Sequence, residues 1–162
     1  FDFYCGGGLD IAFLGFGEID QHGNVNVSKL AGDTVGPGGF IDIAQNARTV
    51  IFCGTFDTGG TSVEIGAGKL LIKVNGRITK LVEEVAQITF SGPQALVRGQ
   101  RIIYVTERAV FILTKDGVAL TEIAPGVDLQ NDVIDQMEFV PRIDAMPKLM
   151  DVSLFYEDGD LT

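Results

Sequence analysis

The chain has 162 residues, of which 46% are hydrophobic, and it carries a formal charge of −10 at pH 7. So many apolar residues exclude a disordered chain, and the scarcity of Lys and Arg argues against nucleic acid or a membrane surface as a partner. The apolar runs are too short to span a bilayer, and no signal peptide is visible, so we expect a soluble, cytoplasmic protein.

The length of the chain suits one hydrophobic core, so we expect residues 1–162 to form a single domain. The chain starts within an apolar segment, Phe1–Tyr4, and has no initiator Met. We therefore expect it to be a fragment of a longer polypeptide.

In the first third of the chain, strand and helix patterns alternate. The apolar run Leu9–Ile19 predicts a central strand that is covered on both faces, and residues 24–28 predict a short strand. A glycine-rich turn at 36–39 precedes a short amphipathic helix at 39–47, and residues 49–55 read as a buried strand.

The middle third favours antiparallel structure. Residues 62–66, 69–74 and 77–82 alternate between apolar and polar side chains. The first two segments are joined by Gly66-Ala-Gly68, and the last two by Asn75-Gly76, a strong hairpin signal. Together they predict an antiparallel β-meander.

The last third predicts strands at 101–105, 109–114 and 118–123, followed by a helix capped by Asp128. The helix is indicated by the spacing of Leu129, Val133, Ile134 and Met137, and Pro141 ends it. The acidic tail from Asp151 to Thr162 either docks or frays.

The glycine-rich turn is the strongest chemical signal. Glycines at a helix start let backbone N–H groups approach a ligand, and this end of a helix carries partial positive charge. Such a turn suits a phosphate or the oxyanion that forms when a thioester is attacked. The turn matches neither the Walker nor the Gly-x-Gly-x-x-Gly pattern, and a purely structural turn remains the alternative.

Other candidate groups favour structural roles. Glu18 and Asp20 share one side of a strand and are interpreted as solvated, whereas Ser28 and Lys29 point to opposite faces and cannot form a dyad. Glu107 and Arg108 indicate a surface or structural pair. These residues form neither a Ser/His/Asp set nor a Cys/His set.

The cysteines and the single histidine give no metal signal. Cys5 and Cys53 lie in apolar surroundings, which predicts buried, reduced thiols. His22 lies in a turn at residues 20–24 and is expected to be exposed to solvent. We expect no metal site.

Eight segments in order resemble the family I coenzyme A transferases, over residues 1 to about 155. They are FDFY (1–4), GGGLD (6–10), GNVNVSK (23–29), GPGGFID with AQN (36–42 and 44–46), FCGT (52–55), QITF (87–90), YVTERAVF (104–111) and EIAPG (122–126). The chain is most similar to the C-terminal, β-subunit-like half of the single-chain acetate/propionate type. The resemblance implies an α/β, CoA-transferase-like (NagB/RpiA-type) domain with a mixed sheet and an antiparallel β-meander.

The resemblance also implies covalent catalysis by a glutamate, through a glutamyl-CoA thioester. In the family this glutamate lies in a Ser-Glu-x-Gly segment upstream of the region that matches Phe1, and no such segment occurs here. We therefore expect the fragment to contain no catalytic residue, to be inactive alone, and to need the N-terminal half of the same enzyme. Acyl-CoA and a short-chain carboxylate are the implied substrates, no cofactor is bound permanently, and we expect a homo-oligomer active in short-chain fatty acid or ketone body metabolism.

The resemblance assigns site residues by position. Gly38 and Gly39 match the glycine loop that contacts the oxyanion or CoA. The residues expected to line the substrate cleft are Gly6, Gly7, Gly8, Asn26, Ser28 and Lys29.

Two alternatives remain at this point. One is a phosphosugar isomerase-like enzyme of the same fold, in which the glycine loop binds phosphate. The other is a non-enzymatic binding or assembly module, in which the glycines only make turns.

Overall fold

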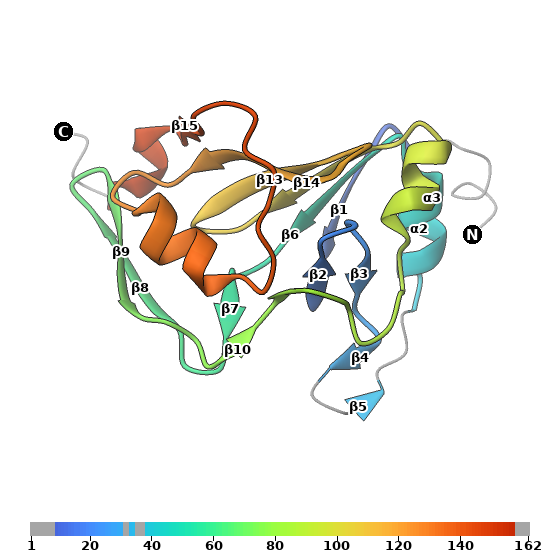
Figure 1. Cartoon of the computed structure of the whole chain (residues 1–162), viewed down its shortest axis with the longest axis horizontal. Coiled ribbons are helices and arrows are strands. Elements are labelled where there is room, and N and C mark those ends of the chain that lie inside the picture. The colour runs from blue at the N-terminus through green and yellow to red at the C-terminus, as the bar shows by residue number, and fades with distance from the viewer. Residues whose placement is uncertain (1–8, 31–32, 35–37, 158–162) are drawn as a thin grey trace.

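The computed structural model describes residues 9–30, 33–34 and 38–157. Its centre is a six-stranded mixed sheet with the order β1-β6-β12-β13-β14-β15 (Figure 1). The strands are β1 (Ile11–Gly15), β6 (Thr49–Cys53), β12 (Arg101–Val105), β13 (Ala109–Thr114), β14 (Gly117–Ile123) and β15 (Lys148–Leu149). The first three run parallel, whereas β13 is antiparallel to both β12 and β14. The predicted mixed α/β architecture is confirmed.

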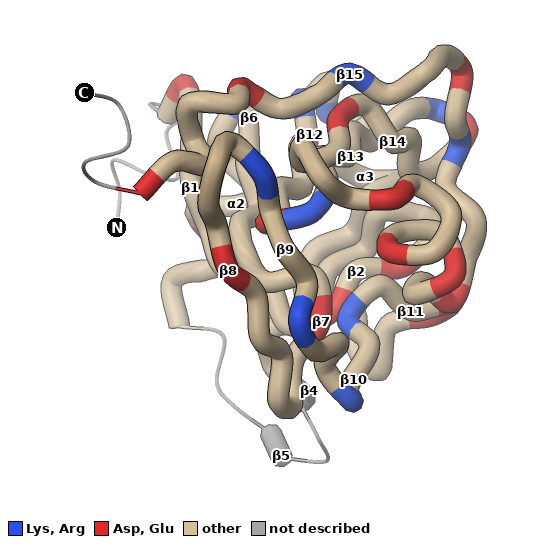
Figure 2. Tube along the Cα trace, turned by 90° about the vertical axis from the view of Figure 1, so that its left-hand side faces the viewer, with Lys and Arg blue, Asp and Glu red and all other residues tan. Residues whose placement is uncertain are grey.

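The described part of the chain also forms four small sheets. In sheet order they are β11 (Leu81–Val82) with β2 (Glu18–Asp20) and β3 (Val25–Asn26); β4 (Lys29–Leu30) with β5 (Asp33–Thr34); β10 (Ile78–Thr79) with β7 (Asp57–Thr58); and β8 (Ser62–Gly66) with β9 (Lys69–Val74). Lys and Arg are spread over several elements of the trace in Figure 2, as expected of an acidic chain that has no basic cluster.

Among the described residues, two short α-helices pack on the central sheet, α2 (Phe40–Asn46) and α3 (Gly92–Val97). Gln100 ties them together, because its amide nitrogen donates to the carbonyl oxygens of Ala44 and Ala47 at 2.9 and 2.6 Å. No helix among the described residues is long and apolar enough to cross a membrane.

The core beneath the helices is aromatic. The ring of Phe52 stacks on Tyr104 at a centroid distance of 5.7 Å and meets Phe90 edge-on at 5.1 Å. The Tyr104 hydroxyl donates to the carbonyl oxygen of Gly23 at 2.7 Å, so the buried phenol is satisfied. Burial raises the pKa of Tyr104 well above its ordinary value.

The predicted central strand over Leu9–Ile19 is wrong in extent and position. The run divides into β1 and β2, and β1 lies at the edge of the sheet. One face of β1 is exposed, because 67% of Phe13 and 47% of Ile11 are accessible to solvent. The apolar run therefore reflects a strand with one face that no described residue covers.

The exposed face continues across the sheet. Register places Phe13 beside Ile51, Ile51 beside Ile103, and Ile103 beside Ile112. Ile51, Ile103 and Ile112 are all half-buried. Phe13, Ile51, Ile103 and Ile112 together are called the isoleucine row from here on. Because parallel sheets are normally covered on both faces, the isoleucine row is a surface suited to another packed element.

The predicted meander is half right. β8 and β9 form the expected hairpin, closed by Ala67 and Gly68, both at positive φ. The prediction of a hairpin at Asn75-Gly76 is wrong, because β10 (Ile78–Thr79) pairs with β7 and β11 pairs with β2. Glycine is required at 76 for space, since a Cβ there would lie 2.6 Å from Thr61 Oγ1 and 2.7 Å from Asp57 Oδ1.

The strands of the C-terminal third follow their prediction closely, whereas the helix predicted to end at Pro141 ends at Gln136. Asp128 caps the helical segment and accepts from the Asn131 N–H at 2.7 Å. The segment is a π-helical turn at Leu129–Val133, then a 3₁₀ turn at Ile134–Gln136. The tail docks as far as a 3₁₀ turn at Val152–Phe155, where Phe155 packs with Leu70 of β9.

Candidate functional site

The three parallel strands end together at one edge of the sheet. Gly15 of β1 pairs with Cys53 of β6, which pairs with Val105 of β12. The segments that follow these strands therefore emerge side by side. In open α/β sheets this carboxyl edge is where ligands bind, so it is the first place to look for a site.

Of the predicted glycine turn, only Gly38 and Gly39 are described, and they lead into helix α2. Helix α2 ends two residues before β6 begins at the opposite edge, so its first turn faces the carboxyl ends of the strands. Gly38 is exposed with φ +55°, and a Cβ there would meet no described atom within 4 Å. Gly39 is the N-cap of α2, with φ −80° and ψ 2°.

Asn26 and Ser28 lie in a buried hydrogen-bond network. The Asn26 amide nitrogen donates to Glu18 Oε2 at 2.7 Å, and its amide oxygen accepts from the Ser28 N–H at 3.0 Å. The Ser28 and Thr89 hydroxyls lie 2.8 Å apart. These contacts show that Asn26 and Ser28 hold the shape of this edge, while their predicted role as cleft lining stays a prediction.

The remaining predicted site residues are less defined. The backbone of Lys29 belongs to β4, which pairs with β5. Gly6, Gly7 and Gly8 lie outside the described residues, as does Cys5. Their roles stay predictions.

The interpretation of Asp20 as a solvated carboxylate is wrong. Asp20 is 2% exposed and accepts hydrogen bonds from the backbone N–H groups of His22 and Asn24 and from the Asn24 side chain, each at 3.0 Å. It closes the turn between β2 and β3. His22 itself is exposed in this turn, as predicted.

The structural reading of Glu107 and Arg108 is confirmed, and Arg108 is the hub of the carboxyl edge. Its guanidinium is fully buried and donates to Asp57 Oδ2 at 2.9 Å and to Asn75 Oδ1 at 2.8 Å. It also donates to Glu107 Oε1 at 3.2 Å and lies 4.7 Å from the centre of the Phe56 ring. One side chain thus joins the segments after β6, β9 and β12.

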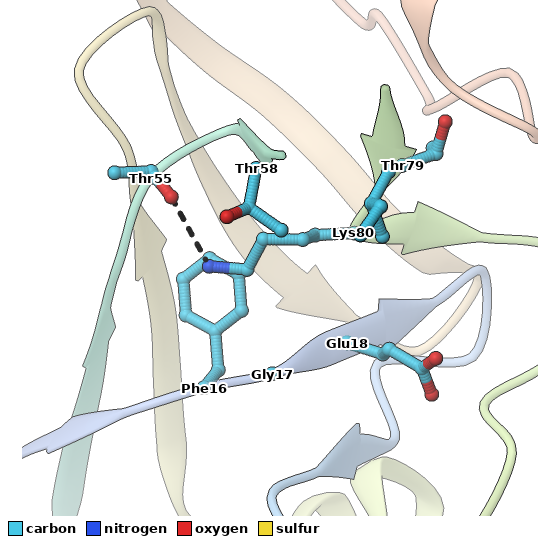
Figure 3. Close-up of a pocket in the computed structure, with 8 residues that line it drawn as sticks. Phe16, Gly17, Glu18, Thr55, Thr58, Thr79 and Lys80 are labelled. Carbon is cyan, nitrogen blue, oxygen red and sulfur yellow. Dashed lines mark hydrogen bonds between the residues drawn. The ribbon is translucent and has the colours of Figure 1, made fainter. Parts of the chain in front are cut away.

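A pocket of about 260 Å³ opens beside this hub (Figure 3). It is lined by Phe16, Gly17, Glu18, Thr55, Thr58, Ile78, Thr79 and Lys80. Lys80 is 8% exposed, and its ammonium lies 4.1 Å from the centre of the Phe16 ring and 3.5 Å from Thr55 Oγ1. Figure 3 shows the Glu18 carboxylate pointing away from the Lys80 ammonium.

Gly54 makes this arrangement possible. A Cβ at Gly54 would lie 2.8 Å from the Phe16 ring and 3.1 Å from Lys80 Nζ. Burial lowers the pKa of Lys80, and the charges of Glu107 and Asp57 act in the opposite direction. The sequence interpretation missed Lys80, although its place next to the buried pair Leu81–Val82 indicates a lysine that is drawn into the fold.

The prediction of a buried Cys53 is wrong. Cys53 ends β6 and is exposed on the same face as Ile51. Desolvation raises the pKa of its thiol, which keeps the thiol protonated near neutral pH. No group of three or more His, Cys, Asp or Glu in the described part of the chain is arranged to hold a metal ion.

Comparison with known proteins places this fold among the CoA-transferases. The chain is 54% identical over 157 residues to acetate CoA-transferase YdiF of Escherichia coli O157:H7, a match that covers 97% of this chain and 30% of that protein. It is 52% identical over 165 residues to caffeate CoA-transferase of Acetobacterium woodii, covering 99% of this chain and 31% of that protein. No family model matches the chain.

Solved structures agree. The crystal structure of the apoenzyme of acyl-CoA transferase YdiF from Escherichia coli O157:H7 matches with a TM-score of 0.94 at 54% identity, over 97% of this chain and 30% of that one. A thioester complex of that enzyme with CoA matches with a TM-score of 0.93 at 55% identity, over 95% of this chain and 30% of that one. The predicted resemblance and the predicted CoA-transferase-like fold are confirmed, and the chain spans about 30% of the length of these relatives.

Proposed function

We propose that this chain, homologous over nearly its whole length to a section of the CoA-transferases, is one domain of a family I CoA-transferase that moves CoA between a short-chain acyl-CoA and a carboxylic acid. The observation that carries the proposal is the identity of 52–54% to two CoA-transferases over at least 97% of this chain. The position of Gly39 at the start of helix α2, which faces the carboxyl ends of the strands, supports the proposal.

The reaction proceeds by covalent carboxylate catalysis. A glutamate outside residues 1–162 attacks the thioester carbonyl, which expels the CoA thiolate and forms an acyl–glutamyl anhydride. The thiolate attacks the glutamyl carbonyl, releases the acid and leaves a glutamyl-CoA thioester. The acceptor carboxylate then attacks this thioester, and the same steps in reverse give the new acyl-CoA and free glutamate.

Each attack passes through an oxyanion, and in this proposal the N–H groups of Gly38 and Gly39 stabilise it. The open space beside Gly38 leaves its backbone approachable. Asn26 and Ser28 support the site through the network with Glu18 and Thr89. Lys29 and Gly6–Gly8 are retained as cleft-lining residues on the strength of the resemblance.

The remainder of the enzyme is proposed to cover the isoleucine row. The relatives are about three times as long as this chain, and a partly parallel sheet needs cover on both faces. The N-terminal half of the same enzyme is the expected partner.

A transfer assay tests the proposed function. We expect the full-length protein to convert acetyl-CoA and propionate to propionyl-CoA and acetate, and mass spectrometry to find CoA attached to a glutamate outside residues 1–162. The isolated chain should show no transfer. Turnover by the isolated chain that is lost on replacing Glu18 or Glu107 would place the nucleophile here instead.

We expect the isolated chain to self-associate through the isoleucine row, because Phe13 is 67% exposed on that face. Light scattering should report a dimer or larger species, and Phe13→Glu should shift it toward the monomer. Val97→Glu is the control, since Val97 is 83% exposed on helix α3, outside the isoleucine row. A strictly monomeric wild-type chain at high concentration would contradict this expectation.

A further inference from the structure

We propose that the pocket beside Lys80 binds the carboxylic acid substrate, with the carboxylate on the Lys80 ammonium and the short chain against Phe16 and Ile78. This inference rests on the proposed function for the identity of the acid. The site itself follows from the geometry of the described residues.

The ammonium of Lys80 is buried with spare donors. It carries three N–H groups, and its one hydrogen bond among the described residues is the 3.5 Å contact with Thr55 Oγ1. It takes part in no ion pair within 4.0 Å among the described residues. A buried charge that lacks hydrogen bonds raises the free energy of the folded protein. The site therefore favours a ligand that accepts hydrogen bonds from the Lys80 ammonium.

The carboxylates near Lys80, those of Asp57 and Glu107, accept hydrogen bonds from other groups. Asp57 accepts from Arg108 and from the Thr61 hydroxyl. Glu107 accepts from Arg108 and from the Phe56 N–H at 2.8 Å. Burial lowers the pKa of Lys80, and the two carboxylates oppose this by favouring its charged form, without occupying its donors. The donors of the ammonium therefore stay available to a ligand oxygen.

The walls of the pocket select for a small molecule with one anionic end. Phe16 and Ile78 supply apolar surface, and Thr55 and Thr58 add hydroxyl groups at the ammonium end (Figure 3). A volume of about 260 Å³ is below the range of drug-sized ligand sites, which suits an acid of a few carbons. The nucleotide end of CoA is larger and carries several phosphates, so the pocket fits it poorly.

Binding should weaken at alkaline pH. The carboxylate requires protonated Lys80, and burial lowers the pKa of Lys80, so affinity should fall at a lower pH than for an exposed lysine. The charged groups around this ammonium are Glu18, Asp57, Glu107 and Arg108.

The test is acetate and butyrate binding to the full-length protein without CoA, followed by ligand-observed NMR. We expect Lys80→Met to weaken binding about ten- to a hundred-fold, as for a lost charge-assisted hydrogen bond. Lys73→Met is the matched control, because Lys73 is exposed and paired with Glu64 at 3.2 Å. Ile78→Trp should fill the pocket and reduce butyrate binding more than acetate binding, which tests the site while Lys80 is retained.

Two outcomes would overturn the inference. One is acetate affinity in Lys80→Met equal to that of the wild type. The other is unchanged acetate binding with weakened binding of adenosine 3′,5′-bisphosphate, which would assign Lys80 to the phosphates of CoA. Lys80-dependent acetate binding without CoA transfer would contradict the proposed function alone, whereas CoA transfer with Lys80-independent binding would contradict this inference alone.

Discussion

Gly39→Val in the full-length enzyme should lower the rate of CoA transfer about a hundred- to a thousand-fold, because the valine side chain would block the oxyanion from a backbone N–H group, and loss of one oxyanion donor costs about 2.7–4 kcal/mol. The backbone of Gly39, at φ −80° and ψ 2°, accepts an L-residue without strain. The branched side chain would instead crowd the thioester beside the helix start. The loss of stability should be on the order of 1 kcal/mol, as for a poor N-cap.

Gly66→Val is the matched control for this substitution. Gly66 ends β8, and a Cβ there would meet no described atom within 4 Å, so both rate and stability should be retained. The rate of propionyl-CoA formation and the urea midpoint are measured for each variant. A Gly39→Val enzyme with a normal rate, or one that simply unfolds, would contradict the oxyanion role and would indicate that Gly38 and Gly39 only form a structural turn.

Arg108→Met should destabilise the protein by about 3–5 kcal/mol, the range for breaking a buried ion pair by removing one partner. Arg108 is fully buried, and its removal leaves Asp57, which is 5% exposed, without its cation. Asn75 and the Asp132 carbonyl lose a donor as well. Urea denaturation of the full-length protein gives the free energy of unfolding.

Arg142→Met provides the comparison. Arg142 pairs with Asp116 at 2.6 Å and Asp144 at 2.7 Å, but 41% of its side chain is exposed, so its replacement should change the free energy of unfolding far less than that of Arg108. A double-mutant cycle of Arg108→Met with Asp57→Asn then isolates the coupling between the two buried charges. Equal effects of the two arginine substitutions would refute the role of Arg108 as the hub.

Local signals in the sequence predicted much of the fold. The strands at 101–105 and 109–114 have the predicted bounds, because alternating side chains specify which face of a strand is buried. Helix α2 and the Asp128 cap were also predictable, since a cap depends on a side chain and a backbone N–H three residues apart. The family resemblance rests on ordered segments, and it too can be read without coordinates.

Contacts between distant segments decided the rest. Asn75-Gly76 has the composition of a hairpin turn, yet Asn75 accepts from Arg108, 33 residues away, and Gly76 gives room to Asp57 and Thr61. Asp20 and Lys80 are of residue types that usually lie at the surface, but both are buried.

The sequence by itself determined the class of fold, most element positions and the resemblance to the CoA-transferases, because these depend on patterns within a few residues or on ordered motifs. Only the tertiary structure decided that β1 is an edge strand, that Arg108 joins three segments, and that Lys80 faces a pocket beside Thr55. The physical reason is that the burial of a charged side chain is stable only where distant segments supply its partners, and a local pattern does not specify which segments meet.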